Sequence, residues 1–182
     1  MTIHEMYVKV LNTPSDIQEH LETLRTYGAT VEYIVELGVR NGLSTLSFLM
    51  SKPLKMTSYD IFITQIAKDI ERQALLENIN FELIEGNSLE VDIPECDLLF
   101  IDTLHTHKQL WIELNNHSHK VKKYIILHDT VTYALFGGGE EGIIKDSDGL
   151  MFSIVKFLVI DEGWKIKEHF TNNNGLTILE RI

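Results

Sequence analysis

Cysteine and proline are scarce in this sequence. Its 182 residues include a single cysteine, Cys96, so no disulfide can form within the chain. Sparse cysteine is usual in proteins of reducing compartments, so we expect a cytoplasmic protein in which Cys96 is a core or surface thiol rather than a nucleophile. With only 3 prolines, the sequence has no proline-rich linker, and no repeat or low-complexity tract divides it. We expect one domain spanning residues 1–182.

Positive charge is also scarce, and long apolar runs are missing. The 16 Lys and Arg residues are outnumbered by 27 Asp and Glu residues, which gives a net charge of −11. Such a surface repels phosphate backbones and anionic lipids, so we expect neither nucleic acid nor a membrane as a partner. No window approaches the roughly 20 apolar residues of a membrane-spanning helix, and residues 1–11 lack a charged leader before an apolar stretch. The sequence predicts a soluble protein that is not secreted.

The most informative segment is a glycine-containing turn between a predicted strand and a predicted helix. The apolar run Tyr33–Val35 leads into Glu36–Gly42, and a helical pattern covers Leu43–Met50. A turn of this kind at the carboxyl edge of a parallel sheet lets a ligand lie against bare backbone, and open α/β folds bind nucleotides there. The order predicts a ligand-binding edge near Gly38 and Gly42.

Acidic residues also follow the predicted strands. Glu36 ends the first apolar run, and Asp60, Asp102 and Asp129 end three later runs. The carboxyl ends of neighbouring parallel strands meet at one edge of a sheet, so we expect these side chains to gather there. Two buried like charges such as those of Asp102 and Asp129 are costly without a cation, and carboxylates favour hard ions such as magnesium. The pair therefore suggests a metal site.

Strand and helix patterns alternate along most of the sequence. Apolar runs without polar alternation suit strands that are buried on both faces, as in a parallel sheet covered by helices. The predicted strands are Tyr33–Leu37, Met56–Asp60, Phe81–Glu85, Asp97–Asp102 and Tyr124–Asp129, and the predicted helices are Leu43–Ser51, Ile63–Glu77, Lys108–Val121 and Leu150–Ile160.

Two segments fall outside this alternation. Residues 1–30 are predicted to be a helical segment, in which Thr13 caps a helix that continues to residue 27. Residues 130–149 contain three consecutive glycines and no apolar period, which is typical of a lid or substrate loop beside a sheet edge. Glu140 and Glu141 on this segment are expected to be exposed.

The sequence ends with a predicted hairpin. Trp164–Phe170 and Leu176–Leu179 are β-type runs, and Asn172–Gly175 lies between them. Asn-Gly between two such runs is a strong signal for a hairpin turn.

Glu-x-Gly-x-x-x-Gly at residues 36–42, followed by a terminal hairpin, resembles the class I methyltransferases that use S-adenosylmethionine. The resemblance covers nearly all of the chain from Tyr33 onward. It implies a Rossmann-like, doubly wound α/β fold with a mostly parallel seven-stranded sheet and a C-terminal antiparallel β-hairpin. It also implies S-adenosyl-L-methionine as the cofactor.

The resemblance implies a position for each part of the cofactor. Gly38 and Gly42 would let the backbone approach its amino-acid and ribose parts, and Glu36 would orient the turn or meet its ammonium. Asp60 would accept both ribose hydroxyls, although a turn residue or helix cap is the alternative for it. The predicted cofactor set also contains Ser44, Asp102, Asn87 and Ser88, of which Asn87 or Ser88 would contact adenine unless the two only form a turn.

The sequences around two of the aspartates refine the resemblance. Leu99–His105 and Ile126–Thr130 look like the strand motifs of metal-dependent small-molecule and sugar O-methyltransferases, and of cephalosporin-hydroxylase-like proteins. Catechol-type members have Asp-Asn at the second motif and macrolide-sugar members have Glu-Asp, whereas residues 128–130 here are His-Asp-Thr. The metal ligands implied for this chain, with Mg²⁺ as the ion, are Asp102, His128 and Asp129.

Histidines are the candidates for proton transfer. A neutral imidazole can take a proton from a substrate hydroxyl, and His105 and Asp102 are the candidate catalytic residues, with loop packing as the alternative for His105. Strand alternation would turn His128 to the opposite side of the sheet unless the strand ends there, which favours a hydrogen-bonded structural histidine. Three further histidines are expected at the surface or in solvent at the ends of a helix, namely His107, His117 and His119.

Together these features predict an enzyme that methylates a hydroxyl of a small molecule or sugar. We expect the acceptor to be held by residues 130–149 or across the contact of a homo-oligomer. One alternative is an NAD(P)-dependent oxidoreductase on a related fold, because Asp60 suits an adenosine ribose equally well, although the glycine spacing argues against it. Another is a non-catalytic cofactor-binding protein, which the short chain and the His-Asp-Thr sequence suggest.

Overall fold

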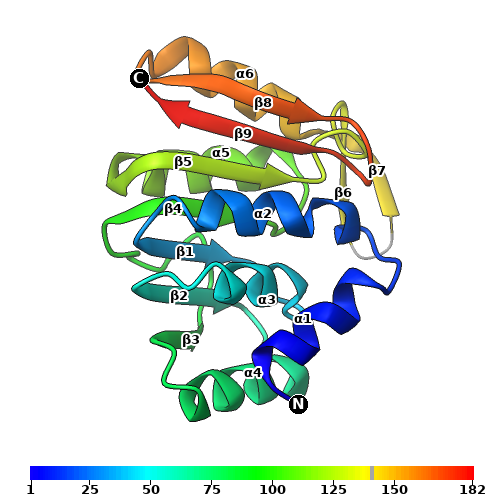
Figure 1. The fold of residues 1–182 in the computed structure, drawn as a ribbon. Coiled ribbons are helices and arrows are strands. Elements are labelled where there is room, and N and C mark those ends of the chain that lie inside the picture. The colour runs from blue at the N-terminus through cyan, green and yellow to red at the C-terminus, as the bar shows by residue number, and fades with distance from the viewer. Residues whose placement is uncertain (140–141) are drawn as a thin grey trace.

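The computed structural model describes residues 1–139 and 142–182, and it contains the expected seven-stranded sheet (Figure 1). Five parallel strands are followed by β9, which lies antiparallel between β5 and β8. The strand order is β3-β2-β1-β4-β5-β9-β8, with the bounds β1 Tyr33–Leu37, β2 Lys55–Asp60, β3 Phe81–Glu85, β4 Cys96–Ile101, β5 Val121–His128, β8 Trp164–Phe170 and β9 Leu176–Arg181. The predicted α/β fold with a C-terminal antiparallel hairpin is confirmed.

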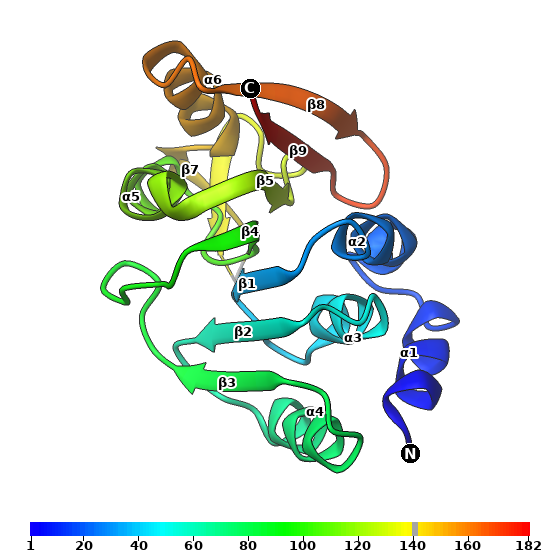
Figure 2. The same ribbon diagram turned by 60° about the vertical axis from the view of Figure 1, so that its left-hand side comes forward.

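Helices cover both faces of the sheet (Figure 2). Phe100 of β4 packs against Phe48 of a helix on one face, whereas its neighbour Leu99 belongs to the core on the other face. This alternation buries the central strands on both sides, as their continuous apolar runs predict. One face carries α1 Ile3–Leu11, α2 Leu21–Gly28, α3 Leu43–Met50 and α4 Gln65–Leu76, and the other carries α5 His107–His117 and α6 Leu150–Ile160.

The N-terminal segment is helical, and the second half of the helix predicted from Thr13 is confirmed as α2, but its predicted start at Thr13 is wrong. The first helix is α1, and Thr2 caps it in a reciprocal capping box with Glu5. Thr13 instead donates its hydroxyl hydrogen bond back to the Lys9 carbonyl, and a 3₁₀ turn at Gln18–His20 leads into α2. The Thr-x-x-Glu pattern at the N-terminus was the signal for this earlier start.

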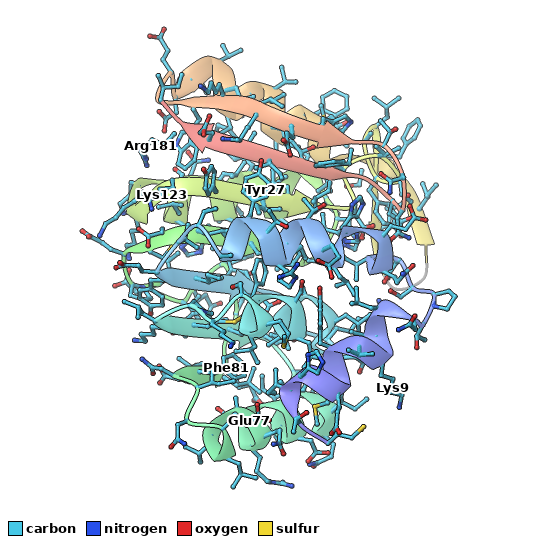
Figure 3. The ribbon with its side chains drawn as sticks, viewed as in Figure 1. Lys9, Tyr27, Glu77, Phe81, Lys123 and Arg181 are labelled. Carbon is cyan, nitrogen blue, oxygen red and sulfur yellow. The ribbon has the colours of Figure 1, made fainter. Side chains whose placement is uncertain are left out.

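Contacts between helices anchor α1. The backbone nitrogen of Ile3 donates a hydrogen bond of 2.8 Å to Oε1 of Glu77, which follows α4 (Figure 3). Tyr7 of α1 donates to Glu22 of α2 at 2.9 Å. The N-terminal helix is thus fixed to two other helices on its face of the sheet.

The segment predicted to be a lid or substrate loop, residues 130–149, contains two paired strands. Strands β6 Phe136–Gly139 and β7 Gly142–Asp148 pair antiparallel in a separate two-stranded sheet. The nitrogen of Gly138 donates a 2.8 Å hydrogen bond to the carbonyl of His105, so the hairpin is fixed to the loop after β4. The expectation of exposed side chains at Glu140 and Glu141 lies outside the described residues.

Two further details differ from the expected alternation. Residues 86–95, all of which the structure describes, contain no helix, so β3 and β4 are joined by one turn and irregular chain. Helix α5 ends at His117, four residues before the predicted end, because a 3₁₀ turn and then β5 follow directly. Within the described residues, no helix has the length and apolar character needed to span a membrane.

Candidate active site

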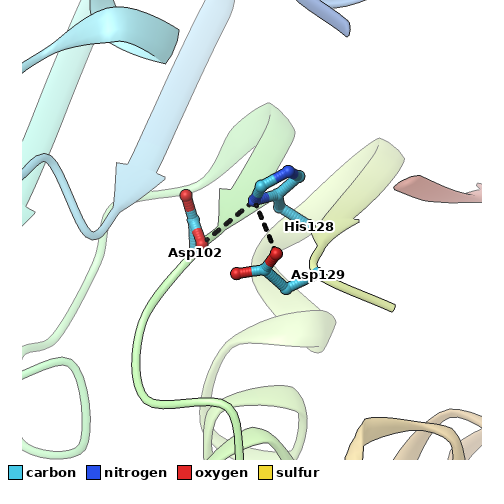
Figure 4. A group of neighbouring side chains, drawn as sticks. All are labelled: Asp102, His128 and Asp129. Carbon is cyan, nitrogen blue, oxygen red and sulfur yellow. Dashed lines mark ion pairs between the residues drawn. The ribbon is translucent and has the colours of Figure 1, made fainter. Parts of the chain in front are cut away.

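The three predicted metal ligands lie together at the carboxyl ends of β4 and β5. Asp102 follows β4, His128 ends β5, and Asp129 is the next residue. The Nδ1 atom of His128 is 3.4 Å from Oδ1 of Asp102 and 3.7 Å from Oδ1 of Asp129 (Figure 4). Each residue offers one ligand atom, and these atoms all lie within 4.8 Å of one another.

The end of β5 explains how two consecutive side chains reach the same site. Asp129 has a φ of +60°, so the strand stops at His128 and the chain turns. Beyond this turn, Val131 donates a backbone hydrogen bond of 2.9 Å to the Asn174 carbonyl in the β8–β9 turn. The exception allowed for His128 therefore applies, because β5 ends at this residue. Its ring faces Asp102 and Asp129 through Nδ1 and also makes the hydrogen bond expected of a structural histidine through Nε2.

His105 lies between the two aspartates. Its Nε2 atom is 2.8 Å from Oδ2 of Asp129 and 3.3 Å from Oδ1 of Asp102. The ring stacks on Tyr133, with the two planes 3° apart and the centroids separated by 4.6 Å. A Cβ atom at Gly138 would lie 1.9 Å from the Tyr133 ring, so this glycine makes space for the stacked pair. Sequence patterns gave no signal for Tyr133.

Proton and charge balance at this site is set by the aspartates. Desolvation lowers the pKa of His105, but the hydrogen bonds and charges of Asp102 and Asp129 outweigh it and raise that pKa to about 9. The same opposition, with Asp102 as the main favourable charge, raises the pKa of His128 to about 9. Although burial opposes it, the two imidazoles hold the pKa of Asp102 well below its usual range. The two aspartates therefore favour the protonated form of both rings.

The other nitrogen of His128 determines which ring atom is available to a ligand. Its Nε2 atom is 3.2 Å from the carbonyl oxygen of Asp16, and a carbonyl can only accept, so Nε2 carries a proton. Among the described residues, Nδ1 of His128 and Oδ1 of Asp129 are buried without a hydrogen-bond partner. An imidazole nitrogen beside two carboxylate oxygens, with the opposite nitrogen bonded to a carbonyl, fits the donor set of a divalent cation.

The glycine turn packs directly against the loop that carries Asp102. Gly38 has a φ of +89°, and a Cβ atom there would lie 2.0 Å from the Asp102 carbonyl oxygen. Gly42 has a φ of +75° and caps α3, where a Cβ atom would lie 2.4 Å from Ile70. Close backbone packing therefore requires Gly38, whereas the left-handed backbone favours glycine at position 42. Their contact with a cofactor stays a prediction.

Glu36 lies beneath this turn. It is fully buried and accepts hydrogen bonds from the hydroxyls of Ser44 at 2.5 Å, Thr45 at 2.7 Å and Ser58 at 2.6 Å. Burial, only partly offset by these hydroxyls, raises the pKa of Glu36 to about 7. The contacts favour the role of orienting the turn and α3 over the alternative of meeting a cofactor ammonium, and they also occupy the Ser44 hydroxyl.

Asp60 supports the same turn from β2. Its Oδ2 atom accepts backbone hydrogen bonds from Val39 at 2.7 Å and Arg40 at 2.8 Å, and its Oδ1 atom accepts one from Phe62 at 2.9 Å. Ile61 and Phe62, the next two residues, are 72% and 71% exposed. A half-buried carboxylate thus lies beside two exposed apolar side chains at the edge where Asp102 also lies.

Solved structures match along almost the entire chain, whereas no family model and no curated protein matches the sequence. A protein of Staphylococcus aureus assigned as a caffeoyl-CoA O-methyltransferase matches with a TM-score of 0.70 and 18% identity, over 100% of this chain and 93% of that one. An O-methyltransferase of Bacillus cereus in complex with S-adenosylhomocysteine matches with a TM-score of 0.67 and 14% identity, over 99% and 89%. The N-methyltransferase NodS of Bradyrhizobium japonicum WM9 matches with a TM-score of 0.66 and 12% identity, over 100% of this chain and 99% of that one.

The chain has the fold of the class I methyltransferases. In this methyltransferase fold, the residues predicted to contact adenine have partners of their own. Ser88 is buried and donates a 2.6 Å hydrogen bond to Oε1 of Glu113, and the Asn87 side chain accepts from Leu89 at 3.1 Å. Their role toward adenine stays a prediction.

Glu113 is a buried acid that the sequence analysis missed. Its Oε1 atom also accepts from Thr103 at 2.7 Å and from Gln109 at 2.8 Å, so this one oxygen connects α5 with the loops after β3 and β4. Burial raises the pKa of Glu113. A glutamate on a helix in a polar stretch gives no signal of burial, because its partners come from two distant loops.

The remaining histidines divide between the surface and the interior. His119 is exposed, as expected, but the expectation for His117 is wrong, because it is buried with Nε2 2.7 Å from the Ser88 carbonyl. His107 is half-buried, with Nδ1 2.7 Å from the hydroxyl of Ser153 on α6, rather than at the surface. Both rings are used in packing α5 against its neighbours.

Proposed function

We propose that this protein is an S-adenosylmethionine-dependent methyltransferase that methylates a hydroxyl group of a small molecule. One observation carries the proposal. The glycine turn contacts Asp60 on one side through the Val39 nitrogen and meets the Asp102 backbone on the other at Gly38. The predicted cofactor and metal residues are therefore neighbours at one edge of a methyltransferase fold, and not two separate clusters.

The cofactor would lie along the glycine turn. Asp60 would accept hydrogen bonds from the ribose hydroxyls through lone pairs that the backbone leaves free, and the exposed apolar side chains of Ile61 and Phe62 would cover the purine. When bound, S-adenosylmethionine supplies an activated methyl group. The protein's main contribution would be alignment of acceptor and donor, because transfer of such a group needs little covalent help.

A divalent cation would be held by Asp102, His128 and Asp129. The buried atoms without partners at His128 and Asp129 support this, as does the carbonyl of Asp16 behind the His128 ring. When bound, the cation would orient a substrate hydroxyl and make it more acidic. An imidazole in the set favours Mn²⁺ and later transition ions more than an all-oxygen set does, so Mn²⁺ is the first ion to test beside Mg²⁺. His105, held in place by Tyr133, is the proposed proton acceptor. It would act in its neutral form, which a cation bound to the two aspartates would favour by offsetting the charges that raise its pKa.

Calorimetry with S-adenosylhomocysteine tests the cofactor proposal. We expect binding by the wild type and loss of binding in Asp60→Ala. Asp69→Ala removes a half-exposed acid of α4 that pairs with Arg72, and it is the matched control for the change in charge. Absence of binding by the wild type at millimolar ligand would end the proposal, and binding of reduced nicotinamide cofactor in its place would support an oxidoreductase.

Calorimetry with Mn²⁺ tests the metal proposal separately. We expect one site per chain in the wild type and loss of that site in Asp129→Asn, which keeps the size of the side chain. If removal of divalent ions changes neither thermal stability nor methyl transfer, the metal assignment fails and the cofactor proposal is unaffected.

A further inference from the structure

We propose that Asn173, in the turn between β8 and β9, is a positioning residue for the His128 ring. It acts by holding the carbonyl group of Asp16 against Nε2 of His128. The ligand role of His128 rests on the proposed function, but the contact itself does not. The chain segment that links them is residues 15–19, between α1 and α2 and outside the sheet.

Asn173 holds this segment at both ends. Its Nδ2 atom donates a 2.8 Å hydrogen bond to the carbonyl of Ser15, and its Oδ1 atom accepts a 2.9 Å hydrogen bond from the nitrogen of Glu19. Asp16 lies within the span that these two bonds fix. The neighbouring Asn172 carbonyl is 3.0 Å from Nε2 of His20, which adds a third contact between the turn and the segment.

When the His128 ring is neutral, which is the form that ligates a metal, the Asp16 carbonyl determines which ring nitrogen carries the proton. Because it accepts the Nε2 proton at 3.2 Å, it directs Nδ1 toward Asp102 and Asp129. Without this acceptor, the proton could sit on either nitrogen and the ring could rotate about its Cβ–Cγ bond. Partners that orient a ligating histidine in this way typically contribute 10 to 100-fold to metal affinity.

The backbone of Asn173 allows a clean test. Its φ is +43°, in the left-handed region that asparagine and glycine tolerate. Asn173→Gly therefore removes both side-chain hydrogen bonds while keeping the turn conformation accessible. Asn78→Gly is the matched control, because Asn78 has a φ of +56° and is exposed at the end of α4, far along the sheet from β5.

Mn²⁺ calorimetry is the first readout. We expect Asn173→Gly to weaken Mn²⁺ binding about 10-fold or more, and Asn78→Gly to leave it unchanged. Asn173→Asp keeps the acceptor for Glu19 and loses the donor to Ser15, so we expect a smaller loss in the same direction. This milder variant decides the question if Asn173→Gly does not fold.

Nuclear magnetic resonance of the His128 ring, without any metal, is the second readout. We expect a slowly exchanging Nε2 proton in the wild type and in Asn78→Gly, and a rapidly exchanging one in Asn173→Gly. An unchanged Nε2 signal together with unchanged Mn²⁺ affinity in the variants would overturn the proposal. If the wild type itself binds no Mn²⁺, the metal part of the proposed function fails, while the proton signal alone still decides the role of Asn173.

Discussion

At the scale of single residues, each of the site's histidine rings has one nitrogen committed to a specific partner. His128 directs Nε2 to a carbonyl and Nδ1 to the aspartates, whereas His105 directs Nε2 to the aspartates and leaves Nδ1 buried without a partner among the described residues. The two rings therefore approach the same carboxylates through different atoms. Substitutions that mimic one nitrogen or the other should separate their roles.

Replacement of His128 by two different amides tests which nitrogen faces a metal. In His128→Asn the side-chain amide lies where Nδ1 is, whereas in His128→Gln it reaches toward the Nε2 position. We expect His128→Asn to retain the greater share of Mn²⁺ affinity, measured by calorimetry. Equal loss in both variants, or better retention in His128→Gln, contradicts the assignment of Nδ1.

Glu36 gives a prediction for stability against pH. Its pKa rises from 4.5 to about 7 on folding, so its contribution to stability is complete below pH 4.5 and is lost as the pH rises through 7. We expect Glu36→Gln to gain stability relative to the wild type across this window, by roughly 3 kcal/mol at about 1.4 kcal/mol per pKa unit. Urea unfolding at pH 4.5 and pH 8 measures the free energy of unfolding of both proteins. A difference between Glu36→Gln and the wild type that is the same at both pH values would falsify the raised pKa.

Residue patterns predicted part of this site. Asp102 and Asp129 were predictable because both directly follow apolar runs, and parallel strands bring such ends together. The positions of Tyr133 and Glu113 were not, because their partners lie in segments that only the fold brings near. His128 was ambiguous, since its direction depends on the residue at which β5 stops.

At the scale of elements, strand β6 lies against the loop that carries His105. Gly137–Gly139 carries no alternating apolar pattern, so the sequence indicated a loop there, whereas the structure pairs β6 with β7 and bonds Gly138 to His105. The predicted helix start at Thr13 was wrong for a related reason. Residues 12–20 are shaped by contacts with the β8–β9 turn, which a local pattern does not contain.

Two glycines of β6 allow a test of how this strand packs against Tyr133. A Cβ atom at Gly138 would meet the Tyr133 ring at 1.9 Å, whereas one at Gly139 would meet only the end of the Leu104 side chain, at 3.3 Å. We expect Gly138→Ala to lower the free energy of unfolding by about 1–3 kcal/mol and to slow methyl transfer. Gly139→Ala should leave both nearly unchanged, and equal effects of the two variants would contradict the packing role of Tyr133.

At the scale of the whole molecule, strand order brings the predicted cofactor residues and the predicted metal ligands together. β1 lies between β2 and β4, so the glycine turn after β1 reaches Asp60 on one side and Asp102 on the other. The continuous apolar runs predicted the parallel sheet, and the hairpin signal predicted its antiparallel edge. Adjacency of β1 and β4 came only from the family resemblance, because strand order is not encoded in local patterns.

Because the glycine turn and Asp102 are adjacent, we expect a substitution in the turn to disturb the metal site as well. In Gly38→Ala a Cβ atom would lie 2.0 Å from the Asp102 carbonyl, so Asp102 must move. We expect weaker binding of both S-adenosylhomocysteine and Mn²⁺ in this variant by calorimetry. Gly42→Ala also strains a left-handed residue but meets only Ile70, so it should destabilise the protein and keep its Mn²⁺ affinity.

The central claim is that one shared pocket at the carboxyl ends of β1, β2, β4 and β5 holds both ligands. A crystal structure of the protein with S-adenosylhomocysteine and Mn²⁺ tests it most directly. The account predicts ribose density against Asp60 and an anomalous manganese peak coordinated by Asp102, His128 and Asp129. Adenosyl density bound elsewhere on the protein, with no peak at these three residues, would contradict it.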